Sequence, residues 1–367
     1  MFLYWLAADM PALRNSAEEL MWFAAQKDLQ ESLAWAYYFR GCAHYMQNDA
    51  PAAADDFLAV ISRRHIASSF VFVQSAFGLA SALFAQTKQD EAQAVIELLA
   101  EYAQEPGNAA VRGMAQACAA GVAYRHDNRE EALRWVAKTE RSFQRRPLIG
   151  LCAAPLVTTL VLIGQGTPAA LLEAEQLLSE EDVFLAETHD RMARIEVLVQ
   201  LAELHVSMNR HEAALLAMRE AVELAQPGGV RRVFLDASRV VRDLLDELEF
   251  TGVHQRFIEE LRVHSPRDNA MQEPAQRMPQ ATAAARDFVQ PRHPDLIELL
   301  TNREMEVLQL LAMRMTNKEI AQALGISTDT VKQHAMNVFR KLHVDNRRAA
   351  VLQARAMGFQ FDNQTML

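Results

Sequence analysis

The sequence is poor in residues that build disulfide frameworks and metal sites. Its three cysteines, Cys42, Cys118 and Cys152, lie far apart and form no CxxC pair. Disulfide scaffolds and structural zinc sites need paired or closely spaced cysteines, so neither is expected, and a reducing, cytoplasmic setting fits. The eleven histidines are scattered and none belongs to an HExxH motif, so no metal is expected.

Signatures of nucleotide-dependent enzymes are also missing. No GxxxxGK(S/T) phosphate loop occurs, and the run GQGTPAA at 164–170 lacks the lysine that such a loop needs. We interpret this run as a turn between two helices. No catalytic constellation appears elsewhere, so the sequence predicts neither an enzyme nor a cofactor.

Export and membrane signals are weak. The N-terminus has no basic region, and its apolar run stops at Asp9, which argues against a signal peptide. Residues 148–166 are uncharged over a bilayer-spanning length, but Pro155 lies inside them and they fall in step with the repeat described below. A buried repeat helix is therefore favoured over a membrane span.

Charge is distributed unevenly along the chain. The net charge is −10, yet residues 1–262 carry 24 Lys and Arg against 36 Asp and Glu, whereas residues 296–367 carry nine against seven. A small basic module joined to an acidic body is expected when only one part contacts nucleic-acid phosphate.

Helix is the expected structure of the first 260 residues, because no stretch alternates with a period of two for long and glycine and proline are sparse. The helices recur. Five alanines are spaced 39, 40, 42 and 39 residues apart, at positions 53, 92, 132, 174 and 213. Twelve residues before each stands a small or apolar residue: Gly41, Ala80, Ala120, Leu162 and Leu201. This pattern predicts antiparallel helix pairs that approach closely at small residues.

The pattern resembles tetratricopeptide repeats. Gly41, Ala53, Phe57 and Val60 match the small, small, aromatic and small-apolar positions of that repeat in order, although the period here is longer. The resemblance implies a right-handed superhelix over residues 1–262, whose concave face binds a small ligand or a protein partner. Residues 263–295, with five prolines between 265 and 294, are expected to form a flexible linker.

The third segment, 296–367, contains a helix-turn-helix pattern. Thr301 to Glu304 and Thr316 to Glu319 are both capping boxes, each opening a helix with an apolar stripe. The second of these helices ends at Gly325, which supplies a positive φ, and a third helix follows over 327–342, capped by Ser327 or Thr328. A short helix, a glycine turn and a further helix are typical of DNA-binding modules.

The third helix has two distinct faces. Val331, Ala335, Val338 and Leu342 form an apolar stripe that predicts a core face. The opposite, polar face is expected to enter the major groove, where Lys332 suits guanine or phosphate, Gln333 suits adenine and Met336 suits a thymine methyl group. The N–H groups at the start of the second helix suit a phosphate. The predicted DNA-binding residues are Thr316, Asn317, Lys318, Ser327, Thr328, Thr330, Lys332, Gln333, Met336, Asn337, Arg340 and Lys341.

Residues 300–358 resemble the LuxR-type, or GerE-type, DNA-binding domain. About twenty positions match, including the runs 317–321 and 330–332, and one departure is Arg314, where the family usually has glycine. The resemblance implies a four-helix domain whose third helix reads DNA. It also implies that a fourth helix, about 346–357, pairs two protomers, with Val351, Ala354 and Arg355 as candidate contacts. Expected partners are promoter DNA and a second copy of the chain, with RNA polymerase as a further candidate.

The order of helical repeat, linker and LuxR-type domain resembles the C-terminal two-thirds of MalT-like regulators. The runs 224–229 and 232–236 resemble the end of their repeat array. In those regulators the array binds an inducer and an N-terminal ATPase gates oligomerisation, but this chain has no such ATPase, so it is either a short relative or a truncated product. Nucleotide-driven assembly is therefore not expected.

Three functions remain to be weighed. The favoured one is an all-α transcriptional regulator, an activator rather than a repressor, whose array senses a ligand or protein. The alternative is a tetratricopeptide-like adaptor that binds only protein. A two-component response regulator is disfavoured, because the N-terminal part lacks the alternating strands of a phosphoacceptor domain.

Overall fold

The computed structural model describes residues 1–264, apart from 28, 65, 105–108, 126–128 and 138–149, and residues 302–356, apart from 314, 343 and 345. The described part is all helical, and no strand occurs in it. The predicted all-α fold of helical repeats followed by a LuxR-type domain is therefore confirmed. Most of the predicted linker, Thr301 with its capping box, and Arg314 lie outside the described residues.

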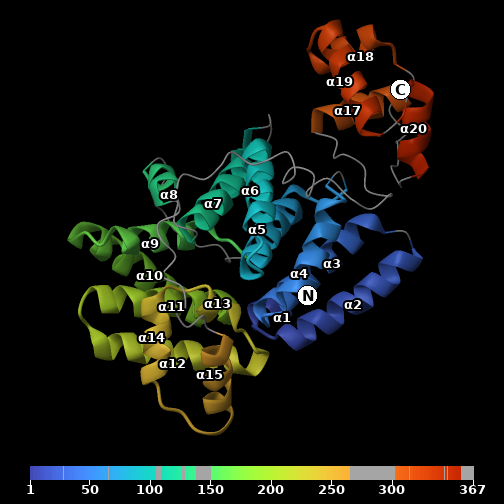
Figure 1. Cartoon of the computed structure of the whole chain (residues 1–367). Helices are drawn as coiled ribbons and strands as arrows, with labels where there is room; N and C mark the ends of the chain where they lie inside the picture. Colours follow the sequence, from blue (N-terminus) through green and yellow to red (C-terminus); the bar gives the residue numbers. More distant parts are fainter. Residues whose placement is uncertain are drawn as a thin grey trace.

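The helices of the first part follow one another in antiparallel pairs (Figure 1). They are α1 (Phe2–Leu6), α2 (Met10–Gln26), α3 (Gln30–Met46), α4 (Ala50–Ile61), α5 (Ser69–Ala85), α6 (Gln89–Gln104), α7 (Ala109–Arg125), α8 (Arg129–Val136), α9 (Ala154–Gln165), α10 (Pro168–Thr188), α11 (Arg191–Ser207), α12 (His211–Ala225), the 3-10 turn η1 (Gln226–Gly228), α13 (Arg232–Leu235), α14 (Arg239–Glu247) and α15 (Gly252–His264).

One three-residue turn recurs between paired helices. It joins α1 to α2, α3 to α4, α5 to α6 and α11 to α12, and its middle residue is left-handed in each case: Ala8, Asn48, Thr87 and Asn209, with φ between 55° and 69°. A residue with a left-handed backbone reverses the chain at the end of one helix, and the residue after it is then the N-cap of the next helix. Asp49, for example, caps α4 by accepting a hydrogen bond from the N–H of Ala52.

The predicted repeat positions are buried in four of the five pairs. Ala53, Ala92, Ala132 and Ala174 have no exposed surface, and the five small or apolar residues that precede them in the pattern are buried too. The fifth alanine was predicted one residue too early. Ala213 is only half-buried and Ala214 is fully buried, because α12 begins at His211 and its inward stripe starts one position later.

The close helix approach expected at Gly41 is present and is shared with Gly78. The ring of Phe57 on α4 lies between them, and a Cβ atom on Gly41 or Gly78 would come within 2.7 or 2.6 Å of that ring. Any larger side chain would displace Phe57, which is fully buried. The two glycines therefore set the spacing of α3, α4 and α5.

Within the apolar segment 148–166, residues 154–165 form helix α9, which is the repeat helix that the sequence predicts. Pro155 lies in the first turn of α9, where its missing N–H has no helical acceptor to lose. The helix ends at Gly166, with φ of 65°, and Thr167 caps α10, so the run 164–170 is a turn between two helices as predicted. Within the described ranges, no helix is long and apolar enough to span a bilayer.

Residues 150–153, just before α9, lie against α5. Gln74 of α5 is fully buried, and its carboxamide donates to the Cys152 carbonyl oxygen and accepts from the Cys152 N–H, both at 2.9 Å. Gly150 has φ of 114°, and a Cβ atom there would lie 2.7 Å from the Gln74 side chain. One glutamine thus satisfies a buried stretch of backbone that has no helix partner.

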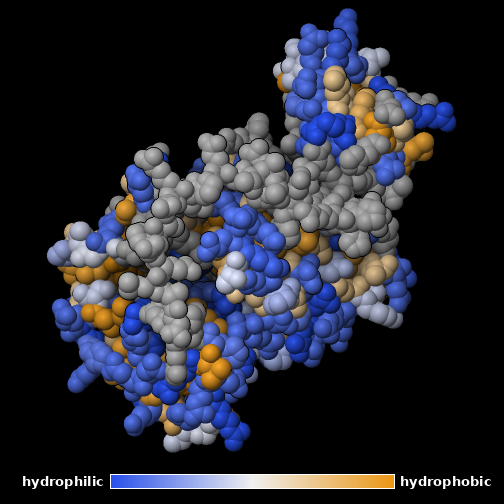
Figure 2. Space-filling model, viewed as in Figure 1, coloured by the Kyte–Doolittle hydropathy of each residue, from blue (hydrophilic) through white to orange (hydrophobic). Residues whose placement is uncertain are grey.

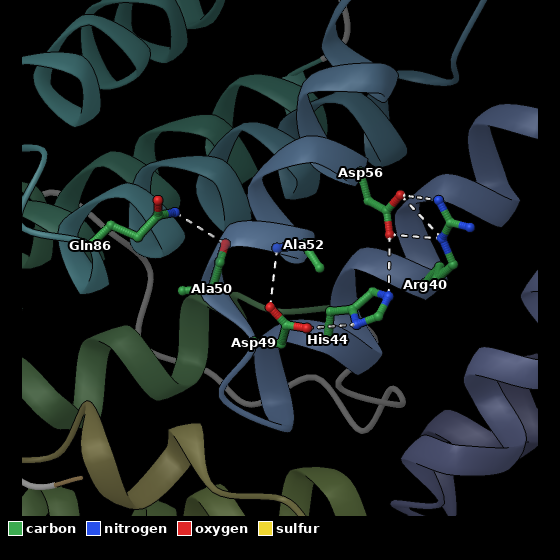
Figure 3. Close-up of polar contacts among 7 residues, drawn as sticks. All are labelled: Arg40, His44, Asp49, Ala50, Ala52, Asp56 and Gln86. Carbon is green, nitrogen blue, oxygen red and sulfur yellow. Dashed lines mark hydrogen bonds and ion pairs between the residues drawn. The ribbon is translucent and has the colours of Figure 1, made fainter.

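A cluster of charged side chains ties α3 to α4 (Figure 3). Arg40 donates two hydrogen bonds at 2.6 and 2.9 Å to the two carboxylate oxygens of Asp56, whose side chain is only 4% exposed. His44 lies between Asp49 and Asp56, with nitrogen–oxygen distances of 3.7 and 3.9 Å. The buried Asp56 charge is therefore paired, and the cluster holds the first full helix pair together.

The two ends of the array meet. The N–H of Arg231 donates to the Met46 carbonyl oxygen at 2.7 Å, and Arg232 donates to the Asn48 side chain at 3.1 Å. Gly228 is packed against the backbone of Ala8, where no side chain would fit. Helix α13 accordingly contacts both α3 and α11 (Figure 1). The helix pairs thus close on themselves.

The last four described helices are α17 (Asn302–Ala312), α18 (Asn317–Leu324), α19 (Thr328–Lys341) and α20 (Arg347–Ala356). They pack mainly on one another. Their cores contain Leu308, Val338, Leu342 and Ala350 on one side, and Val307, Leu311, Ile320, Ala321, Val331 and Ala335 on the other. Phe339 packs against both clusters and joins them.

Candidate DNA-binding site

The predicted capping box at the start of α18 is present. The Thr316 Oγ1 accepts from the Glu319 N–H at 3.3 Å, and the Glu319 carboxylate accepts from the Thr316 N–H at 2.6 Å. The bonds from Thr316 lower the pKa of the Glu319 carboxyl, which is therefore ionised at neutral pH. Glu319 places a negative charge where a phosphate was expected, so the exposed Lys318 is better suited to contact the backbone than the N–H groups.

The turn between α18 and α19 takes three residues. Gly325 has φ of 64°, as predicted, and the Ile326 N–H returns to the Ala321 carbonyl oxygen at 3.0 Å. Ile326 packs on the core next to Ala321. A left-handed glycine followed by an apolar contact is a common helix end, and it fixes the angle at which α19 leaves α18.

Helix α19 begins after a serine cap. The Ser327 Oγ accepts from the Thr330 N–H at 3.1 Å and lies 2.8 Å from the Thr330 hydroxyl, so of the two proposed caps the structure uses Ser327. Both hydroxyls are exposed, as is Thr328. These residues start the helix and stay accessible to a ligand.

The two faces of α19 lie as predicted. Val331, Ala335, Val338 and Leu342 are at most 6% exposed. Lys332, Gln333, Met336 and Arg340 are exposed on the other side, and Met336 is 62% exposed. Asn337 lies at the edge and is half-buried. A polar helix surface with one accessible apolar side chain has the composition that major-groove recognition requires.

Lys332 is not a free cation in this structure. Its Nζ lies 2.9 Å from Asp329 Oδ1, in a pair that is exposed on both sides. The pair lowers the pKa of Asp329. The sequence patterns did not predict this pairing. Any phosphate or base that approaches Lys332 must compete with Asp329.

Lys341 has a different environment from the other predicted DNA-binding residues. Its side chain is 14% exposed, and its Nζ lies 2.8 Å from the Glu304 carboxylate of α17, which is 4% exposed. A buried carboxylate needs a partner, and Lys341 supplies one. We therefore assign Lys341 to holding α17 against α19.

Helix α20 begins with Asn346 as its cap, since the Asn346 side chain accepts from the Ala349 N–H at 2.9 Å. Arg347 donates to the Leu311 carbonyl oxygen at 2.7 Å and so anchors α20 to the end of α17. Val351, predicted at a dimer contact, is half-buried and packs on the domain's own core. The side chains of Ala354 and Arg355 lie outside the described residues.

Leu352 is the residue that the sequence patterns did not single out. Its side chain is 57% exposed on α20, and Figure 2 shows apolar surface, in orange, on this part of the molecule. An exposed leucine on a helix expected to pair with a second copy is a better contact candidate than Val351. The sequence could have revealed Leu352, because in the helical periodicity of α20 Val351 falls on the apolar face that packs on the core and Leu352 does not.

Comparison with known families identifies this domain. Residues 298–354 match the family described as bacterial regulatory proteins of the luxR family, GerE. The C-terminal domain is a LuxR-type helix-turn-helix. Helices α17 to α20 fall within or at the edge of the matched range, and α18 and α19 are its helix-turn-helix.

Over part of its length the chain is similar to known regulators. It is 46% identical over 63 residues to the response regulator protein VraR of Staphylococcus aureus strain NCTC 8325 and to that of Staphylococcus epidermidis strain ATCC 35984. The match covers 17% of this chain and 30% of either relative. The chain thus matches less than a third of the length of those relatives.

No group of three or more His, Cys, Asp or Glu side chains comes together as a metal site in the part of the chain that the structure describes. Cys42, Cys118 and Cys152 are free and buried. Burial raises the pKa of Cys118, which makes its thiol a poor nucleophile.

Proposed function

We propose that this protein is a DNA-binding transcriptional regulator, an activator rather than a repressor, that reads the major groove with α19. The observation that carries the proposal is the exposed face of α19, where Lys332, Gln333 and Met336 stand together on a helix fixed by α18 and the core. The luxR-family match over residues 298–354 supports the same function.

The proposed contacts divide into two kinds. Lys332, Gln333 and Met336 would face base edges, with Asn337 and Arg340 beside them. Thr316, Lys318, Ser327, Thr328 and Thr330, around the starts of α18 and α19, would contact the DNA backbone. Phosphate contacts position the protein and base contacts give specificity, so substitutions in the two groups should have different effects.

Control of DNA binding is proposed to reside in the helix pairs. Their inner surface is the natural place for a small effector or a protein partner, and the LuxR-type domain would respond by dimerising on a two-fold operator through α20. Leu352 and the neighbouring turn of α20 are the proposed dimer contact. We further propose that the protein acts in the cytoplasm, needs no cofactor and catalyses no reaction.

The test is fluorescence-anisotropy titration of the full chain with the DNA upstream of its own gene, at several salt concentrations. Each lost base contact costs about 1–3 kcal/mol, so Lys332→Ala/Gln333→Ala should weaken specific binding by at least roughly tenfold. Weak binding that falls steeply with salt should remain, since the backbone contacts are intact.

The matched control is Gln309→Ala, because Gln309 is exposed on α17, a helix that carries none of the proposed contacts. It should bind as the wild type does. If the wild-type chain shows no salt-dependent DNA affinity, the titration is repeated with residues 296–367. Binding by that fragment alone would indicate a closed full-length state, and its absence would favour the protein-binding adaptor.

A further inference from the structure

Helix α10 presents large apolar side chains to solvent as well as to the core. Leu172 is 59% exposed and Val183 is 60% exposed, and Gln176 and Ser179 are exposed between them. Leu172 and Val183 are eleven residues apart, close to three helical turns, so they lie on one stripe about 16 Å long. A helix that packs only on its inner side normally carries polar residues on such a stripe.

Ion pairs hold α12 alongside α10, with the two helices running in the same direction. Arg210, the residue before α12, pairs with Glu175 of α10. Further along, Arg194 of α11 bridges the two helices, since its guanidinium lies 2.7 Å from Asp182 of α10 and 2.6 Å from Glu220 of α12. Positions 175 to 182 of α10 are therefore level with positions 210 to 220 of α12.

Leu216 of α12 falls within that span and is 67% exposed. It is therefore level with the part of α10 between Leu172 and Val183. We call these three side chains the apolar ridge. Single exposed apolar residues are common on protein surfaces, but three large ones on neighbouring helices are typical of a protein-binding surface. A length of about 16 Å matches one side of a three-turn helix.

The surroundings of the apolar ridge are acidic. From position 167 to position 190 the sequence contains seven Asp and Glu and no Lys or Arg. Glu180 and Glu187 are exposed on the same stripe of α10 as Leu172, and Glu223 is exposed on α12. Complementary charge selects partners, so the ridge favours a basic helix with an exposed apolar side chain and repels DNA.

Helix α20 of the LuxR-type domain has this complementary composition. Residues 346–357 contain three arginines and no Asp or Glu. Arg348 and Leu352 are both exposed, Leu352 by 57%, and they are four residues apart. Residues at this spacing lie on the same face of a helix. One face of α20 thus offers the cation and the leucine that the ridge favours.

The LuxR-type domain is joined to the array close to the apolar ridge. Helix α15 packs against α12, which carries Leu216, and α15 ends at His264. The 37 residues from 265 to 301 connect it to α17, and a chain of that length can span up to about 120 Å. A tether that starts beside a binding surface raises the local concentration of the domain it carries.

We propose that α20 docks on the apolar ridge of its own chain, with Leu352 against the ridge and Arg348 beside Glu180 and Glu187. The inference rests on the proposed function, since it names a regulation of the α20 contact. Leu352 cannot contact the ridge and a second copy at once, so docking and dimerisation on DNA exclude each other. The structure describes the undocked form, in which α17 to α20 pack mainly on one another (Figure 1). An effector that binds the undocked form better would raise DNA affinity.

The first test is photo-cross-linking in the full chain without DNA. Ser179, exposed between Leu172 and Val183, is replaced by the photoreactive p-benzoylphenylalanine. Irradiation should cross-link position 179 to residues 346–357 of the same chain, identified by mass spectrometry, with a yield independent of protein concentration. Leu352→Ser should reduce the yield, and so should added salt, because salt screens exposed charges. The same photoreactive residue at Leu3, 79% exposed on α1, should not reach α20.

The proposal is overturned if position 179 gives no cross-link to residues 346–357. It is also overturned if the cross-link forms only between two chains, which would assign the ridge to a second copy.

The second test is DNA binding by the full chain with Leu172→Ser/Val183→Ser. Both side chains are exposed, so these substitutions should change stability little, which circular dichroism checks. If the docked form holds nine-tenths of the molecules, the variant should bind DNA about tenfold more tightly than the wild type. Leu3→Ser, the control, should bind as the wild type does. Unchanged or weaker DNA binding by the ridge variant would contradict docking.

The two tests separate this inference from the proposed function. A cross-link from position 179 to α20 in a chain that binds no DNA would support docking and refute the regulator. DNA binding without that cross-link would support the regulator and refute docking.

Discussion

Replacing Glu181 with glutamine should make the protein more stable at alkaline pH. Glu181 on α10 and Asp190, the cap of α11, are each only 3% exposed. Burial, and secondarily Asp190, raises the pKa of Glu181 to about 7, and burial raises that of Asp190 to about 6. Asp190 Oδ1 accepts from the Ala193 N–H, but its Oδ2 is buried and has no partner within the described chain.

The size of the effect follows from the pKa of Glu181 in the two states. A rise from 4.5 in the unfolded chain to about 7 in the folded one corresponds to about 3 kcal/mol. The folded state holds this proton between those two pH values while the unfolded state has released it. Stability is therefore lost as the pH rises from about 4.5 through 7, and the full loss is present above pH 8.

Glu181→Gln removes this loss, because glutamine has no proton to release. The difference in unfolding free energy between variant and wild type should grow by about 3 kcal/mol between pH 5 and pH 8.5. For a part of this size, that corresponds to roughly 6–12 °C in Tm. Urea unfolding and thermal melts, followed by circular dichroism across this pH range, measure the difference directly.

Glu187→Gln is the matched control, since Glu187 is exposed on the same helix. It should change stability little at any pH. Asp190→Asn should show a smaller gain than Glu181→Gln and keep the helix cap, because asparagine also accepts at that position. A constant difference between Glu181→Gln and wild type at every pH would refute the argument that burial holds the proton on Glu181.

Three other substitutions test separate contacts. Gln74→Leu should destabilise the array by about 2–5 kcal/mol, measured by urea unfolding, because it leaves two buried backbone groups without partners; a loss below 1 kcal/mol would contradict that role. Asp329→Asn should tighten DNA binding several-fold in the anisotropy titration by releasing Lys332 and removing a negative charge, and weaker binding would show that the carboxylate itself contacts the DNA. Lys341→Gln should lower the stability of the LuxR-type domain by about 3 kcal/mol, because it strands the buried charge of Glu304; loss of DNA affinity without loss of stability would instead make Lys341 a DNA contact.

Local sequence signals predicted the LuxR-type domain closely. Capping at Thr316 and Ser327, the glycine turn at Gly325 and the apolar stripe of α19 each depend on residues within one or two helical turns. Such interactions are formed by neighbours in the chain and can be recognised without knowing the fold. The same holds for the helix pairs, where burial confirmed four of the five repeated alanines and placed the fifth one position away.

Contacts between distant residues could not be predicted in this way. Lys341 fits a basic DNA-binding helix by its type, and only the packing of α17 against α19 gives it Glu304 as a partner, 37 positions away. Likewise Val351 fits a dimer helix by its position, and only the tertiary structure turns it toward the core and leaves Leu352 exposed. In both cases the residue type allows two roles, and the neighbouring helix decides between them.

The sequence by itself determined that the chain is helical, where its pairs turn and which face of α19 is polar, because these properties follow from periodicity, caps and turn residues over short distances. The tertiary structure decided how the pairs close on themselves. The bond from Arg231 to Met46 and that from Tyr45 to Asp236 join residues 185 and 191 positions apart. No local pattern encodes such a contact, since it depends on the summed angles of every helix pair between its two ends.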